Sequence, residues 1–270
     1  MAKYKKKRVR ELQHDRFRDT TITLFDRLGD LLEGKGRSIL YGIAGLILVA
    51  LIVGFWLRWS HRKDDEARRS LGRAIAIATT PVSSTPSASA TTPSYTSEQE
   101  RAQKAVEEFQ KVAVKYGEPY RTEARYFMAT NLLSIDRNRA ISELAELSKS
   151  SNVGVATLAK FALAQAKEAD GKYDEAAQLY GELAKQNNEF ISADTANLRL
   201  ALVYEKQGKK KEAADLLFNI VESARKAKDT DGATLPQSAA ARSAAQELQK
   251  LDPSRYAQLS PEAPAADLTF

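Results

Sequence analysis

The chain of 270 residues contains no cysteine and only two histidines, His14 and His61. Without cysteine it has neither a disulfide framework nor a thiolate ligand for a metal ion. The sequence also lacks a glycine-rich phosphate-binding loop, a cluster of histidine and carboxylate residues, and a nucleophile next to a plausible base. These absences predict that the protein is not an enzyme and has no catalytic, cofactor-binding or metal-binding residues.

An excess of positive charge is also missing from most of the chain, although the net charge is +6. Residues 1–38 contain 11 Lys or Arg and 6 Asp or Glu, and residues 58–78 contain 6 and 3. The remainder of the chain therefore has a net charge of −2. Nucleic-acid binding requires clustered cations on the binding domain itself, so we expect no nucleic acid as a partner.

The apolar run over 39–57 carries no charge. A helix of this length spans about 28 Å, close to the ~30 Å hydrocarbon core of a bilayer. Tyr41, Trp56 and Trp59 lie near its ends, where amphipathic rings favour the membrane interface. The run predicts one transmembrane helix, with the lipid bilayer as a partner.

Residues 1–38 precede this span and form a basic tail. Apolar side chains recur in the tail at helical spacing, which predicts an amphipathic helix that lies on an anionic leaflet or simply precedes the span. The stripe consists of Phe17, Thr21, Leu24, Leu28 and Leu31.

The charges that flank the span leave its orientation open. Lys or Arg occurs six times over 58–73, directly after the span, and three times over 27–37, directly before it, which favours a cytoplasmic C-terminal domain. However, the dense cluster from Lys5 to Arg8 lies in a short tail, and a long domain is translocated largely regardless of its charge. These two facts favour the opposite orientation.

An alanine recurs at intervals of 35, 36 and 37 residues, each time four residues before a larger apolar or aromatic residue. A period of this length is typical of stacked helix pairs, in which a small residue lets the two helices of a pair approach closely. The alanines are Ala105, Ala140, Ala176 and Ala213, and the larger residues are Phe109, Leu144, Tyr180 and Leu217.

The apolar periodicity predicts a first and a second helix in each pair. First helices are expected over 121–134, 155–169 and 192–207, and second helices over 97–116, 137–149, 173–186 and 210–226. Gly171 and Gly208 follow two of the first helices, where a left-handed glycine ends a helix. A closing helix is expected over 238–251, and residues 252–270 are expected to be disordered.

The first of the recurring alanines, Ala105, has no first helix directly before it. Residues 79–97 stand in that place, and all but four of them are Ser, Thr or Pro. We expect them to form a flexible insertion within the first pair, whose first helix then lies upstream, around Leu71. This hypothesis requires Leu71 to contact Phe109. In the alternative, 79–97 is an ordinary linker that follows a separate helix.

The units around Ala176 and Ala213 resemble tetratricopeptide (TPR) repeats. The resemblance is carried by Leu163, Ala164, Gly171 and Tyr180 in one unit and by Leu200, Ala201, Tyr204 and Gly208 in the next. The large aromatic residue expected early in each first helix is missing, with Lys160 and Asn197 in its place, so the domain is TPR-like. The expected fold is all-α: one transmembrane helix plus a TPR-like α-solenoid of about four helix pairs over 58–251, with a C-terminal capping helix.

The order of these segments resembles the YfgM-type ancillary subunits of the SecYEG translocon, including an aromatic exit from the span over 55–61. The resemblance implies a single-pass protein of the bacterial inner membrane, with a cytoplasmic N-terminus and a periplasmic C-terminal domain. It implies assistance to Sec-linked export, with the translocon, a membrane-bound prolyl isomerase chaperone and secreted clients as partners. The alternatives are an envelope-assembly or cell-division scaffold and a cytoplasm-facing membrane adaptor.

Protein binding is expected on the concave face that the first helices form. The polar and apolar side chains predicted there suit adaptable binding of a peptide or a domain. The candidate residues are Arg125, Ala129, Leu132, Phe161, Gln165, Glu168, Leu198, Leu202 and Glu205.

Overall fold

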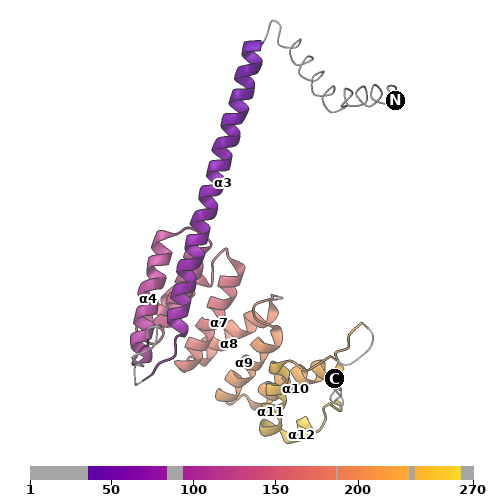
Figure 1. Cartoon of the computed structure of the whole chain (residues 1–270). Coiled ribbons are helices and arrows are strands. Elements are labelled where there is room, and N and C mark those ends of the chain that lie inside the picture. Colours follow the sequence, from indigo (N-terminus) through magenta and orange to yellow (C-terminus); the bar gives the residue numbers. More distant parts are fainter. Residues whose placement is uncertain (1–35, 84–93, 187, 231–234, 263–270) are drawn as a thin grey trace, which may run out of the picture. The chain divides into compact units, whose positions relative to one another are not determined.

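The computed structural model describes residues 36–83, 94–186, 188–230 and 235–262, without the side chains of 36–46 and 54–62. Within these ranges it contains ten helices, labelled α3 to α12 (Figure 1). The β pairing in the same ranges is limited to one isolated bridge, so the fold is all-α, as the sequence predicts. The chain divides into two compact units, Met1–Asp65 and Glu66–Phe270.

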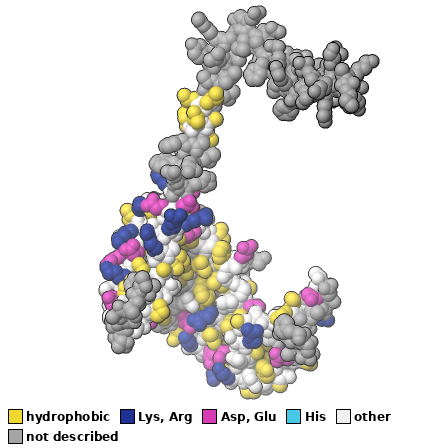
Figure 2. Space-filling model, in the orientation of Figure 1, with side chains coloured by type: hydrophobic (Ala, Val, Ile, Leu, Met, Phe, Trp, Pro, Cys, Tyr) yellow, Lys and Arg dark blue, Asp and Glu magenta, His cyan; other side chains and the backbone are white. Residues whose placement is uncertain are grey.

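Helix α3 (Gly36–Thr79) begins in the first unit. Six side chains between Ile47 and Val53 are large, apolar and 48–67% exposed (Figure 2). Among the described residues, no helix combines the length and the apolar character needed to cross a membrane. The predicted span over 39–57 falls mostly on residues whose side chains lie outside the described set, and the predicted amphipathic helix lies within 1–35, also outside it.

The second unit is a row of helices, each packed mainly against its neighbours in sequence. They are α4 (Glu98–Lys115), α5 (Tyr120–Leu132), α6 (Arg137–Leu147), α7 (Val153–Ala169), α8 (Tyr173–Lys185), α9 (Ala193–Lys206), α10 (Lys210–Lys226), α11 (Ala239–Leu251) and α12 (Pro253–Tyr256). Lys160 and Lys167 of α7 pair with Glu182 and Glu175 of α8 respectively, so these two helices run antiparallel. The bounds of α4 to α11 agree with the predicted helices to within a few residues.

The recurring alanines occupy the closest approaches within this row. All four are fully buried, and the larger residues four positions later are 0–1% exposed. A methyl group is the largest side chain that such a position accepts without pushing the two helices apart, and the larger residue fills the space beside it. The repeat that the sequence shows is therefore a repeat of helix packing.

The ends of the helices are fixed by side chains and by glycine. The side chains of Ser97, Asn152 and Ser192 each accept a hydrogen bond from a backbone N–H in the first turn of the following helix. Gly171 and Gly208 have φ values of +71° and +76°, the left-handed conformation predicted for them. Because these turns are short, each first helix is followed directly by its partner.

The part of α3 that belongs to the second unit packs with α4 and α5. Leu71 and Phe109 belong to the same buried cluster. Arg68 Nε also donates a hydrogen bond of 2.9 Å to the hydroxyl of Tyr120. The first helix of the row is thus the end of α3, on the N-terminal side of the Ser/Thr/Pro-rich segment.

The two ends of that segment are held together. Val82 and Tyr95 form the isolated bridge, and the Ser83 N–H donates to the carbonyl oxygen of Tyr95 at 3.0 Å. A guanidinium nitrogen of Arg101 donates to the carbonyl oxygen of Thr80 at 3.2 Å. Residues 84–93, most of the predicted insertion, lie outside the described ranges.

The C-terminal segment differs from the prediction of disorder over 252–270. It forms α12 and then packs onto α10, with Leu259 buried in the cluster of α9, α10 and α11. The carboxylate of Glu222 accepts hydrogen bonds from the backbone N–H and the hydroxyl of Ser260, at 2.9 and 2.7 Å. Arg225 donates a hydrogen bond to the backbone carbonyl oxygen of Ser260. The prediction of disorder was wrong for residues 252–262, because amino-acid composition does not reveal specific contacts such as those of Glu222 with Ser260. The final eight residues lie outside the described ranges.

Candidate binding surface

The nine predicted binding residues differ in exposure. Gln165 and Glu205 are exposed. Half-buried positions are occupied by Arg125, Phe161, Leu198 and Leu202. Ala129 is fully buried, and Leu132 and Glu168 are 3% and 6% exposed. The exposed and half-buried members are therefore the ones that can touch a partner directly.

Ala129 and Leu132 are buried because the first helices touch one another as well as their own partners. Ala129 of α5 lies in one cluster with Val155, Ala159 and Ala162 of α7. Leu132 belongs to the neighbouring cluster that includes the end of α3. At these positions the small and apolar residues serve the stacking of consecutive pairs.

Arg125 is held by two carboxylates of the second helix of its own pair. Its Nη2 lies 2.8 Å from Glu143 Oε2 and 2.8 Å from Glu146 Oε2, and its Nε donates to Glu143 at 3.1 Å. Burial tends to lower the pKa of the guanidinium, but the hydrogen bonds to Glu143 and Glu146 outweigh it and the pKa is raised. This part of the surface therefore carries one fixed cation between two anions.

A buried carboxylate joins the third and fourth helix pairs. Glu168, in the last turn of α7, accepts a hydrogen bond of 3.0 Å from the Tyr180 hydroxyl of α8 and one of 2.8 Å from Lys206 Nζ of α9. Arg199 of α9 donates to the same carboxylate. The Phe161 ring packs edge-to-face on Tyr180, with their centroids 5.8 Å apart. Side chains from three helices thus meet at one anion.

The environment of this cluster shifts the pKa values of its members. Burial raises the pKa of Glu168, but the hydrogen bond from Lys206 and the charge of Arg199 outweigh it, so the pKa is lowered overall. Burial also raises the pKa of Tyr180 to about 12. Near neutral pH the carboxylate is ionised and the phenol is a neutral donor, which is the arrangement that the hydrogen bonds need.

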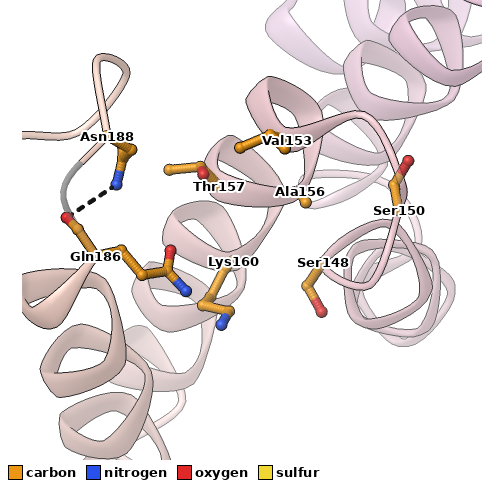
Figure 3. A pocket seen from close by; sticks show the side chains of 8 residues that line it. All are labelled: Ser148, Ser150, Val153, Ala156, Thr157, Lys160, Gln186 and Asn188. Atoms are coloured by element: carbon orange, nitrogen blue, oxygen red, sulfur yellow. Dashed lines mark hydrogen bonds between the residues drawn. The ribbon is translucent and has the colours of Figure 1, made fainter.

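A groove of about 380 Å³ opens at the N-terminal end of α7, the end opposite Glu168 (Figure 3). Figure 3 shows α7 between two loops, with Ser148 and Ser150 on one side and Gln186 and Asn188 on the other. Its lining consists of Ser148, Ser150, Val153, Ala156, Thr157, Lys160, Gln186 and Asn188. Lys160 pairs with Glu182 at 2.9 Å, so the groove offers hydroxyl and amide groups and little unbalanced charge.

An apolar contact lies next to Val153, one of the lining residues. Phe190 lies on Gly154, where a Cβ atom would come within 2.7 Å of the ring. A larger residue at 154 would therefore require the exposed Phe190 ring to move, and the contact places the loop between α8 and α9 next to the start of α7. Val153 and Phe190 remain 66% and 52% exposed beside the groove.

The hydroxyl, amide and apolar groups of this surface are suited to binding. In the described part of the chain, no group of three His, Cys, Asp or Glu side chains is placed to hold a metal ion. Comparison with known proteins finds no matching protein family, no matching curated protein and no matching solved structure. The function is therefore inferred from the sequence and from the surface of the structure.

Sequence reasoning missed two parts of this surface. Arg199 and Lys206 are seven residues apart and so share a face of α9, a signal that could have marked them as joint partners of Glu168. The polar loop residues of the groove, such as Ser148 and Asn188, follow no periodic pattern. Their proximity depends on how the pairs stack, which the spacing of residues does not specify.

Proposed function

We propose that the chain is a membrane-anchored, TPR-like scaffold that mediates protein–protein interactions at the periplasmic face of the bacterial inner membrane. In this role it assists Sec-linked export and the transfer of secreted clients to a chaperone. The observation that supports a scaffold role is the row of antiparallel helix pairs packed around four fully buried alanines. Such rows present extended surfaces that bind other proteins.

The anchor is supported by the uncharged run over 39–57 and by the exposed apolar side chains between Ile47 and Val53. Apolar side chains that are half exposed or more on a helix suit contact with lipid. The periplasmic side, the translocon and the prolyl isomerase chaperone enter through the resemblance to the YfgM-type subunits. The second candidate, a cytoplasm-facing adaptor, is favoured by the six Lys or Arg residues that follow the run.

A pair of reporter fusions after residue 262 distinguishes the two orientations. Alkaline phosphatase is active only after export, so the proposal expects an active phosphatase fusion and an inactive cytoplasmic reporter at the same position. The reverse result would reject the periplasmic scaffold in favour of the cytoplasm-facing adaptor. Recovery of both fusions in the soluble fraction of the cell would reject the anchor itself.

Site-specific crosslinking in cells then tests the partners. A photoreactive amino acid in place of the exposed Gln165 reports on the concave face, and the same amino acid in place of Lys211, on a second helix, serves as the control. We expect crosslinks to the translocon and to a membrane-bound prolyl isomerase from Gln165 and not from Lys211. Crosslinks from Gln165 to cell-wall or outer-membrane assembly proteins alone would support the envelope-assembly alternative instead.

A further inference from the structure

The loops that join one helix pair to the next lie on one edge of the second unit. Because consecutive helices are antiparallel, the turns within pairs lie on the opposite edge, where Asp174 accepts from Gln207 at 2.8 Å. Phe190 on Gly154 shows that neighbouring loops between pairs lie close together. We call these loops and the adjoining helix ends the inter-pair edge (Figure 1). Its four segments, within the described residues, are 111–121, 148–153, 185–194 without 187, and 226–238 without 231–234.

The large apolar side chains exposed in the described part of the second unit all lie on the inter-pair edge. There is one in each of its four segments: Val114 at 77%, Val153 at 66%, Phe190 at 52% and Leu235 at 43% exposure. The turns within pairs carry no such side chain among the residues that the structure describes. Single exposed apolar residues are common on protein surfaces, but their restriction to one edge, one per loop, is a pattern.

Each exposed apolar residue has a lysine nearby in sequence. Lys115 follows Val114 directly, and the other three lysines precede their apolar residue by four to seven positions. The lysines are Lys115, Lys149, Lys185 and Lys228, and all are exposed. The described residues of the four segments include seven Lys or Arg and four Asp or Glu, so this part of the edge has a positive excess. A lysine stem can lie along apolar surface while its ammonium reaches an anionic headgroup.

This pattern fits a lipid surface better than a protein partner. A stable protein interface needs a contiguous apolar core with a polar rim. Here the apolar residues are distributed one per loop, and only Val153 and Phe190 flank a common groove. A bilayer offers a continuous interface into which separate apolar side chains insert one by one, while lysines meet its phosphates.

The chain also enters the second unit at this edge. Lys115, at the end of α4, pairs with Glu66, the first residue of the unit, and Tyr120 at the start of α5 accepts from Arg68. Glu66 and Arg68, near the start of the second unit, therefore lie next to the inter-pair edge.

We propose that the inter-pair edge binds the anionic surface of a bilayer, with Val114, Val153, Phe190 and Leu235 at the interface and the neighbouring lysines on lipid phosphates. The proposal rests on the membrane anchor proposed above and adds a second contact with lipid. It makes the opposite edge and the concave face the surfaces that remain accessible to protein partners.

Fluorescence quenching in nanodiscs tests this contact. The chain contains no cysteine, so each variant carries a single thiol for an environment-sensitive dye. The test positions are Phe190→Cys and Val153→Cys, and Lys172→Cys, in the turn between α7 and α8, is the control on the opposite edge. The full chain is reconstituted into discs of phosphatidylglycerol and phosphatidylcholine that contain lipids spin-labelled near the headgroup.

We expect quenching about threefold stronger at positions 190 and 153 than at 172, because only the first two would lie at the interface. It should weaken in discs of phosphatidylcholine alone. It should also weaken when salt rises from about 0.1 M to about 1 M, which shortens the screening length from ~10 to ~3 Å. The second variant guards against loss of the contact between Phe190 and Gly154.

The possible failures are distinguishable. If the chain enters the discs and the dyes at 190 and 153 are quenched no more than the dye at 172, the inter-pair edge does not bind lipid and the anchor stands. If added membrane proteins shield these dyes while lipid does not quench them, the edge binds protein and the proposal is likewise overturned. If the chain does not associate with the discs at all, the anchor fails and the edge contact fails with it.

Discussion

Replacement of Glu168 by Gln tests how consecutive helix pairs are joined. The side chain is 6% exposed and accepts hydrogen bonds from Tyr180, Arg199 and Lys206. Glutamine has nearly the same size and keeps one carbonyl oxygen, so the change removes the charge and leaves the packing in place. The two cations of α9 then lose their counter-ion.

The expected loss of stability follows from the exposure of the partners. A hydrogen bond to a charged group contributes about 1.5–3 kcal/mol, and an unpaired buried charge costs more. However, the side chains of Arg199 and Lys206 are 31% and 49% exposed, so both can regain water when the carboxylate is gone. We therefore expect Glu168→Gln to lower the free energy of unfolding by about 2 kcal/mol, the lower part of that range.

The assay is urea unfolding of the full chain in detergent, followed by circular dichroism at several pH values. Because the pKa of Glu168 is lowered in the folded state, its contribution is fully present above the ordinary glutamate pKa of 4.5. That contribution is lost as the pH falls through the lowered pKa. The difference between wild type and Glu168→Gln should therefore be full at neutral pH and shrink in the acidic range.

Glu107→Gln is the control, since it removes a carboxylate that pairs with Lys104 on the surface, where both side chains are 55% exposed. Exposed ion pairs contribute little, so we expect no resolvable change. A difference for Glu168→Gln that stays constant down to acidic pH would refute the electrostatic explanation. A loss no larger than that of the control would show that the cluster does not join the pairs.

Four further substitutions test other parts of the fold. Phe109→Ala should cost about 3–5 kcal/mol in urea unfolding, because this fully buried ring lies between α3, α4 and α5; a cost below about 1 kcal/mol would contradict that packing. Gly171→Ala should destabilise the folded protein by about 1–2 kcal/mol, because residue 171 has a left-handed φ of +71°. Gly181→Ala should stabilise it by up to about 1 kcal/mol, because Gly181 lies inside α8 with open space around it. Glu222→Gln should speed amide hydrogen exchange at Ser260, because the Glu222 carboxylate accepts a hydrogen bond from the Ser260 N–H. Unchanged exchange would show that the C-terminal segment is held by apolar contacts alone.

The fold was predictable from sequence where buried residues of one kind recur at regular spacing. Ala140 and Ala176 had to be small because two helices meet there, and Gly171 had to be glycine because its backbone is left-handed. These requirements are local to one helix pair, so one sequence reveals them. The same periodicity predicts that the helix around Leu71 pairs with the helix of Phe109, and both residues belong to one buried cluster.

The binding surface was less predictable because it depends on the rotation between consecutive pairs. Ala129 occupies a position that spacing assigns to the concave face, yet the contact between α5 and α7 buries it. The two cationic partners of Glu168, Arg199 and Lys206, lie 31 and 38 residues further along the sequence. They meet Glu168 only because consecutive helix pairs stack. Asp252 is the C-cap residue of α11, and its side chain also caps α12, a helix that the apolar spacing does not predict.

The bridge between Val82 and Tyr95 has a consequence for how this protein can change over time and in the laboratory. The ten residues between Ser83 and Ser94 begin and end at a closed base, so their number does not affect the packing of α3 on α4. Doubling the length of a loop whose ends are already held costs only about 0.6 kcal/mol. This site should therefore accept an epitope, a fluorescent protein or a whole extra module, and it offers a place to attach new parts to the array without redesigning any helix.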